Sequence, residues 1–93
     1  MSTPRVLVDF NEYDRVSGEV PIPRASIFDI ERSGTKARDG LLVELYSADL
    51  DDNGEPADLV AVGRIRYDAT VDLWIACVDP QTFRHIAHTR AAN

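Results

Sequence analysis

Apolar and polar positions alternate clearly along the second half of the chain. Leu41, Val43 and Leu45 occupy every second position of one segment. Residues 59–67 and 71–78 repeat this spacing. A period of two residues is that of a β-strand with one buried face. The pattern therefore predicts three strands in an antiparallel meander, with their odd-numbered side chains in the core.

Two polar segments separate these strands. The longer, Asp49 to Asp58, contains the dipeptide Asn53-Gly54, a strong signal for a hairpin turn. The shorter runs from Asp68 to Thr70. We expect an acidic hairpin loop at the first position and a tight turn at the second. If the odd positions point inward, Cys77 is a buried and inert thiol.

The first half of the chain is less regular. Residues 5–10 are rich in β-branched and aromatic side chains and predict a first strand. Residues 11–40 hold three glycines and two prolines without a sustained helical period. We interpret them as a long excursion that packs back on the core and contains one or two short strands.

The strand pattern is interrupted at Asp79-Pro80. Asp is a good N-cap and Pro a good first helical residue. These residues predict one 3₁₀ turn over residues 81–83, then a short strand through Ile86. Residues 87–93 are expected to be a frayed tail. We expect a single domain over residues 1–93, with its core at about residues 4–86.

Two short segments resemble the SH3 family. Residues 6–10, Val-Leu-Val-Asp-Phe, resemble its ALYDY segment, and residues 80–83, Pro-Gln-Thr-Phe, resemble its P-x-x-Y segment. The resemblance implies an all-β, mainly antiparallel fold: a small SH3-like barrel with a long first loop and a single 3₁₀ turn before the last strand. Leu59-Val60 stands where the family has its ligand-binding Trp, and only Phe10 and Phe83 match its peptide groove. The resemblance therefore implies the barrel and not the binding of proline-rich peptides.

Composition and charge narrow the classes of partner. The chain has 93 residues, of which 44% are hydrophobic, and a net charge of −6. Residues 39–79 carry ten acids against two arginines. This charge argues against nucleic-acid backbones and anionic membranes as partners, and it fits solubility or a basic partner. The single cysteine and the lack of a long apolar run predict a cytoplasmic protein.

No motif commits the chain to a chemistry. Asp49, Asp51 and Asn53 match the first half of a calcium loop, but Val60 stands where that loop needs a Glu. We interpret the segment as a hairpin turn and leave calcium binding open. The metal-capable side chains near the C-terminus are poorly spaced, because a three-residue interval puts His85 and His88 on opposite faces of a strand. We expect no catalytic residue, no metal and no cofactor.

One face of the predicted sheet is a candidate binding surface. The even-numbered positions gather Tyr46, Arg64, Arg66 and Trp74, which are residue types common in binding hot spots. Alternatively, residues 11–40 cover this face as a second piece of core, and Glu44 or Asp72 neutralises the arginines. The outcome depends on where residues 11–40 pack.

We therefore expect a non-enzymatic protein-interaction domain, such as a small acidic bacterial or phage inhibitor or adaptor. It would use this sheet face or the acidic loop with Asp49, Asp51 and Asp52. One alternative is a nucleic-acid-binding small barrel, and a second is a small enzyme or metal-binding domain. The partner and the oligomeric state stay open.

Overall fold

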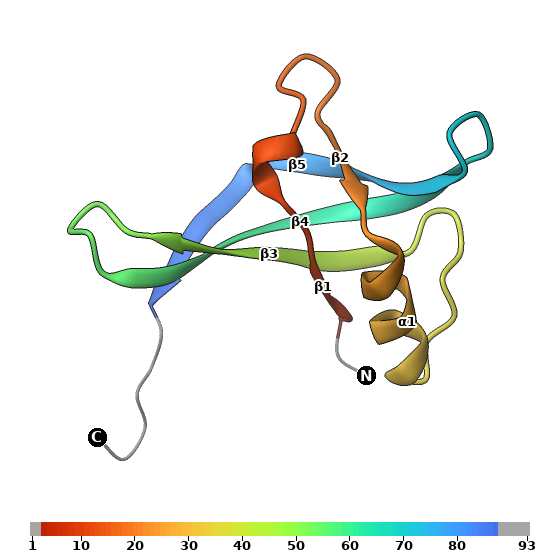
Figure 1. The fold of residues 1–93 in the computed structure, drawn as a ribbon, viewed down its shortest axis with the longest axis horizontal. Helices are drawn as coiled ribbons and strands as arrows, with labels where there is room; N and C mark the ends of the chain where they lie inside the picture. Colours follow the sequence, from red (N-terminus) through yellow and green to blue (C-terminus); the bar gives the residue numbers. More distant parts are fainter. Residues whose placement is uncertain (1–2, 88–93) are drawn as a thin grey trace.

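A computed structural model describes residues 3–87 as a curled sheet with one helix and one 3₁₀ turn (Figure 1). Its five strands form a half-barrel in the order β1-β3-β4-β5-β2. The elements are β1 (Arg5–Leu7), the 3₁₀ helix η1 (Phe10–Glu12), β2 (Glu19–Ile22), α1 (Arg24–Arg32), β3 (Leu42–Leu50), β4 (Pro56–Asp68) and β5 (Leu73–Ala87). The mainly β class and the meander are confirmed. The sheet is mixed, because β1 runs parallel to β3.

The hairpin between β3 and β4 is longer than its polar sequence suggested. The two strands pair from Leu42 opposite Arg64 to Leu50 opposite Pro56. Only residues 51–55 remain for the turn. The Asp51 carboxylate accepts the N–H groups of Asn53 and Glu55 at 2.9 and 3.0 Å. Gly54 has φ 78°, so the Asn53-Gly54 turn is confirmed within a shorter loop.

The first strand ends earlier than expected. β1 stops at Leu7, and the Asp9 carboxylate accepts the Asn11 N–H at 2.9 Å. This contact caps η1, which places Phe10 in a 3₁₀ turn rather than in the strand. Within the described residues β1 pairs with β3 alone, so the curled sheet has free edges and does not close.

Residues 11–40 contain one of the short strands that we expected, β2, and a helix that we did not. α1 follows Pro23 directly and buries Ile30 completely. The hydroxyl of its Ser26 donates to the Leu7 carbonyl at 2.6 Å, which ties the helix to β1. Phe28 on the other side of the helix is 63% exposed. The prediction missed α1 because nine residues with so few inward positions show too little periodicity.

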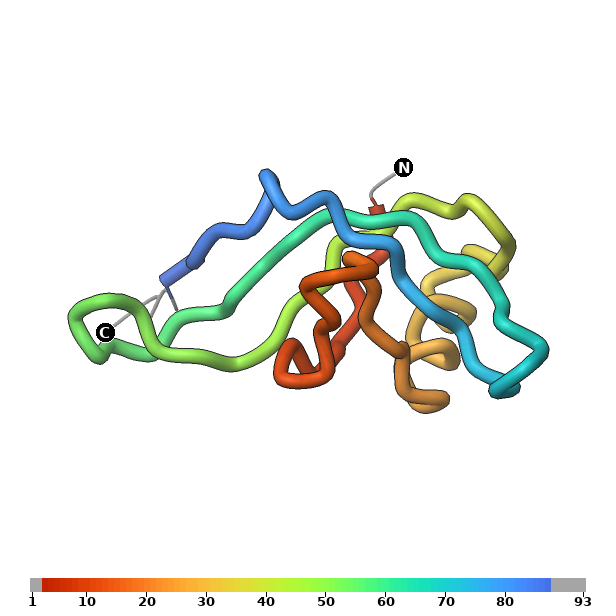
Figure 2. Tube along the Cα trace, turned by 90° about the horizontal axis from the view of Figure 1, so that it is seen from above, coloured from red at the N-terminus to blue at the C-terminus, as the bar shows by residue number. Residues whose placement is uncertain are grey.

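The core lies between β3–β5 and the N-terminal segments. Figure 2 shows η1, β2 and α1 on one side of the three long strands. The odd-numbered Val43, Leu45 and Ile65 are fully or almost fully buried there, as the alternation predicted. Residues 11–40 therefore cover the odd-numbered face of β3 and β4. The alternative in which they cover the even-numbered face is wrong.

On β5 the inward face was predicted wrongly. The turn over residues 69–72 sets Asp68 opposite Leu73, so odd positions of β4 pair with even positions of β5. Ala76 and Val78 are buried as a result, and Cys77 is exposed. The length of one turn thus reverses the two faces of the strand.

A β-bulge replaces the predicted 3₁₀ turn over residues 81–83. Val62 pairs with Asp79, but Val60 pairs with Arg84, so residues 80–83 lie opposite Ala61 alone. β5 continues as a strand through this bulge to Ala87. The inward face changes again, because three residues are added to one strand only.

The ends of the chain test two further expectations. Ala87, the first residue of the predicted tail, is the last residue of β5. Residues 88–93, which include His88, lie outside the described residues. Among residues 3–87 no helix has the length and apolar character needed to cross a bilayer.

Helix α1 offers a test of this packing. Ile30→Ala should lower the free energy of unfolding by about 2–5 kcal/mol, because it leaves a cavity in a fully buried position. Phe28→Ala on the same helix should change it by less than about 0.5 kcal/mol. Urea unfolding followed by circular dichroism measures both. Equal losses in the two variants would contradict the orientation of α1.

Candidate functional site

The structure places the four residues of the predicted binding face on two different sides of the sheet. Tyr46, Arg64 and Arg66 lie on the outer face of β3 and β4, opposite the core. Trp74 lies opposite Tyr67 and Ile22 on the core side, where it packs against the core cluster. Its ring centroid is 5.6 Å from that of Tyr67. The four residues therefore do not form one surface.

The outer face is covered by polar contacts within the chain. Arg66 Nη2 lies 2.6 Å from Glu19 Oε2, and this hydrogen bond is the main cause that raises the pKa of Arg66. Arg64 Nη1 donates to the Gly40 carbonyl at 2.9 Å. The partners that we expected, Glu44 and Asp72, pair with other arginines. A ligand on this face would have to displace these contacts.

Arg5 completes this layer beside Tyr46. Its guanidinium carbon lies 4.3 Å from the centroid of the Tyr46 ring, a cation–π geometry. Its Nε donates to Glu44 Oε1 at 2.8 Å, and Arg84 approaches the other oxygen of Glu44 at 3.5 Å. The Tyr46 ring is thus already in contact with another residue of this chain, Arg5.

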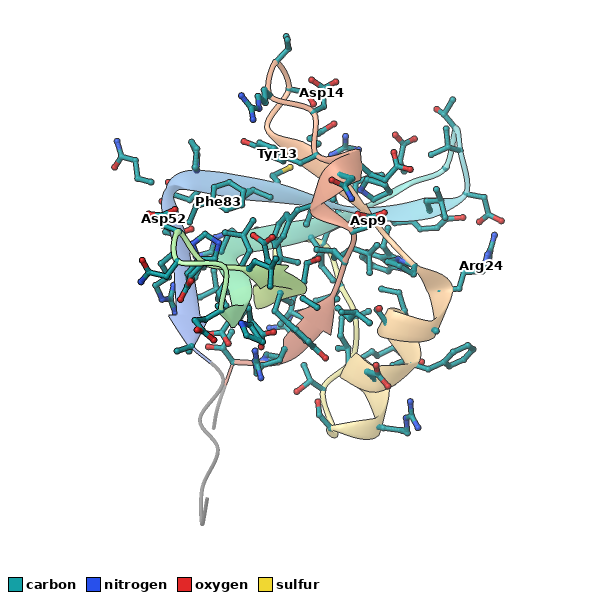
Figure 3. All side chains as sticks on the ribbon, turned by 60° about the vertical axis from the view of Figure 1, so that its left-hand side comes forward. Asp9, Tyr13, Asp14, Arg24, Asp52 and Phe83 are labelled. Carbon is teal, nitrogen blue, oxygen red and sulfur yellow. The ribbon has the colours of Figure 1, made fainter. Side chains whose placement is uncertain are left out.

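The carboxylates of the acidic loop have separate surroundings and do not form one cluster. Asp51 caps its own turn, and Asp49 Oδ2 lies 2.9 Å from His85 Nε2. Asp52 is exposed at the tip of the hairpin (Figure 3). Residues 3–87 hold no group of three or more His, Cys, Asp or Glu side chains placed to bind a metal ion.

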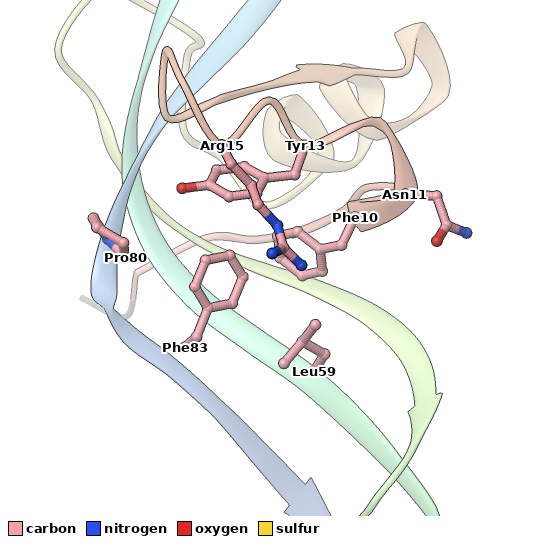
Figure 4. A pocket seen from close by; sticks show the side chains of 7 residues that line it. All are labelled: Phe10, Asn11, Tyr13, Arg15, Leu59, Pro80 and Phe83. Carbon is pink, nitrogen blue, oxygen red and sulfur yellow. The ribbon is translucent and has the colours of Figure 1, made fainter.

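An open groove lies between η1 and the bulge of β5. Its main cavity measures about 620 Å³. Aromatic and aliphatic side chains predominate in its lining, which consists of Phe10, Asn11, Tyr13, Arg15, Leu59, Pro80 and Phe83 (Figure 4). We call this site the aromatic groove. Phe10 and Phe83 meet here.

Three rings form the centre of the aromatic groove. Tyr13 N donates to the Phe10 carbonyl at 3.1 Å, and the 3₁₀ geometry puts these side chains, three residues apart, on the same side. The centroid of the Phe83 ring lies 5.2 Å from that of Phe10, with an angle of 69° between the ring planes. The corresponding values for Phe83 and Tyr13 are 5.3 Å and 71°. These are edge-to-face contacts, which aromatic rings favour. All three side chains are half-buried.

The bulge of β5 brings Pro80 and Phe83 to the groove. The Thr82 hydroxyl accepts the Val62 N–H at 2.8 Å and donates to the Asp79 carbonyl at 2.6 Å. It therefore fills a gap that the register shift opens in the β4–β5 ladder. Phe83 consequently points toward the core side, where it packs against the core cluster.

The groove continues across β4 toward β3. A second cavity of about 170 Å³ shares Phe10, Asn11 and Leu59 with the first and reaches Ser47 and Asp49. The site is therefore elongated rather than round. At its far end the hydrogen bond from His85 is the main cause that lowers the pKa of Asp49.

A second apolar hollow lies between α1 and the β4–β5 turn. Its cavity of about 170 Å³ is lined in part by Phe28, Tyr67 and Trp74. The Tyr67 hydroxyl bonds to the Asp72 carboxylate, which also pairs with Arg24 at 3.1 Å. This bond raises the pKa of Tyr67 and lowers that of Asp72. The hollow is smaller than the aromatic groove, and its charged groups are already paired.

Of the groove residues, only Phe10 and Phe83 were considered as members of a binding groove from the sequence. The spacing Asp9-Phe10-Asn11-Glu12-Tyr13 carried a usable signal, an N-cap followed by two aromatic residues three apart. Leu59 and Arg15 join them only through the tertiary fold. Comparison with protein-family models, curated proteins and solved structures finds no match. Function must therefore be argued from the geometry.

The role of Thr82 can be tested with two variants. Thr82→Val keeps the shape of the side chain but removes both hydrogen bonds, so unfolding should require about 1–2 kcal/mol less free energy. Thr82→Ser keeps the hydroxyl and should lose less than half of that. Chemical denaturation measures both variants. A Val variant as stable as wild type would refute the role of this hydroxyl.

The contact between His85 and Asp49 predicts a pH dependence. Because the folded pKa of Asp49 lies below its ordinary value of 3.8, the contact stabilises the fold above that pH and is lost as the pH falls through the lowered value. His85→Gln should raise the pKa of Asp49 toward 3.8. Carbon-detected NMR titration of the Asp49 carboxyl tests this, and an unchanged pKa would contradict the contact.

Proposed function

We propose that this chain is a non-enzymatic protein-interaction domain that binds an extended segment of a partner protein in the aromatic groove. The observation that carries the proposal is the meeting of Phe10, Tyr13 and Phe83 over an open cavity of about 620 Å³. Aromatic side chains gathered in a concave site are typical of binding hot spots and of ligand sites.

The shape of the groove favours an extended chain as the occupant. The groove is open to solvent and runs from Pro80 on β5 across Leu59 on β4 to Asp49 on β3. An extended segment presents side chains at intervals that such a groove can receive. The proposal moves the expected site from the face with Tyr46 and Arg64 to the opposite side of the sheet.

The SH3-like interpretation stays a proposal. It is supported by the two segments that carry the resemblance, because their Phe10 and Phe83 touch each other in the groove. An adaptor or inhibitor role would follow from the identity of the partner.

A displayed library of random segments is a direct probe; each segment is about twelve residues long and reaches about 40 Å when extended. Wild-type protein should enrich segments that bind with micromolar affinity in fluorescence anisotropy. Phe83→Ala should weaken that binding at least about tenfold, because it removes the ring at the centre of the groove.

Phe28→Ala is the matched control, since it removes an exposed ring that does not line the groove. It should leave the affinity unchanged, and melting curves should show that both variants fold. Segments that bind equally well to the Phe83 variant would place the site elsewhere. Labelled single-stranded DNA at low salt is a further arm of the test. Binding of that DNA, lost in Phe83→Ala, would favour a nucleic-acid-binding domain instead.

A further inference from the structure

We propose that the aromatic groove selects a partner segment in which a single carboxylate stands beside an apolar anchor residue, and that Arg15 binds this carboxylate. The inference rests on the proposed function and names the chemistry of the partner. Arg15 is the only charged side chain that lines the main cavity. Figure 4 shows it crossing the Tyr13 ring, with its guanidinium group toward Phe10.

Arg15 has no side-chain partner within residues 3–87, whereas most other arginines of this part of the chain have one. Within residues 3–87 it makes no ion pair and its side chain makes no hydrogen bond. Six other arginines of this part of the chain bond to a carboxylate or a carbonyl: Arg5, Arg24, Arg32, Arg64, Arg66 and Arg84. Arg38 shares the lack of a side-chain partner with Arg15, but it does not line the groove.

Three acids that adjoin groove residues in the sequence accept backbone N–H groups of their own turns. Asp14 accepts the N–H groups of Val16 and Ser17 at 2.8 and 3.3 Å, and thereby shapes the loop that carries Arg15. Asp9 and Asp79 accept backbone N–H groups in the same way, at 2.9 and 3.1 Å. Within residues 3–87 none of these three acids pairs with Arg15, so its guanidinium remains available to a ligand.

The remaining polar groups of the cavity also suit an acceptor. Tyr13 and Asn11 also line the cavity, and their side chains make no hydrogen bond within residues 3–87. Both groups can donate, as the guanidinium does. A carboxylate accepts several hydrogen bonds and pairs with arginine in a bidentate geometry. Arg15 is exposed, so the bond would supply selectivity for a carboxylate, and most of the affinity would come from the apolar anchor.

The charge of the whole chain limits the partner to one acid. At a net charge of −6 the protein repels a run of carboxylates over long range. A single carboxylate next to a large apolar residue avoids most of this repulsion. The apolar residue would pack on the open sides of Phe10, Phe83 and Leu59.

Selection with the same displayed library provides the test. Wild-type protein should enrich segments with one Asp or Glu within two positions of an aromatic or aliphatic residue. Arg15→Glu should enrich Lys or Arg at that position instead. Arg38→Glu changes the net charge by the same amount, away from the groove, and should enrich the wild-type pattern.

A double-mutant cycle then isolates the contact. Each enriched segment is synthesised with its acid or with the corresponding amide. Wild-type protein should bind the amide form about tenfold more weakly, as expected for a lost hydrogen bond between charged groups. Arg15→Gln should bind both forms equally.

Three results would overturn the inference while leaving the proposed function standing. They are enrichment of basic segments by wild type, wild-type binding of the amide form as tight as that of the acid form, and an Arg15→Gln variant in which the change from acid to amide weakens binding as much as it does in wild type. If no segment is enriched at all, the proposed function itself fails.

Discussion

The register shift in β5 decides which side chains reach the core side of this sheet. Residues 80–83 lie opposite Ala61 alone, and the Thr82 hydroxyl takes over the backbone contact that the ladder loses there. Without the shift, the side chains of β5 beyond the bulge would exchange faces. Phe83 would then leave the rings of η1, and the aromatic groove would lose its centre. A local irregularity in one strand thus sets the geometry of the candidate site.

Features that depend on neighbouring residues could be predicted from the sequence. Alternation identified the buried faces of β3 and β4, and Asn53-Gly54 identified the hairpin turn. Features that depend on counting residues across a turn could not. A turn over residues 69–72 reversed the faces of β5, which exposed Cys77 and moved Trp74 to the core side. Helix α1 was missed because it buries only a few side chains.

The two faces of the sheet differ in how their charges are satisfied. On the outer face, contacts such as Arg66 with Glu19 hold the arginines within the chain. In the aromatic groove, the hydrogen bonds of Asp14 shape a loop whose Arg15 keeps no partner among the described residues. Composition alone fitted solubility or a basic partner, because it averages over both faces. The groove locally favours the opposite charge in its ligand.

Binding in the aromatic groove is mapped most directly by the amide NMR shifts of the labelled wild-type domain during titration with an enriched segment. The shifts should centre on η1 and on the β5 bulge, at Phe10, Tyr13 and Phe83. Amides on the outer face, such as those of Arg64 and Arg66, should move little. Shifts centred on the outer face, with the groove unchanged, would contradict the account.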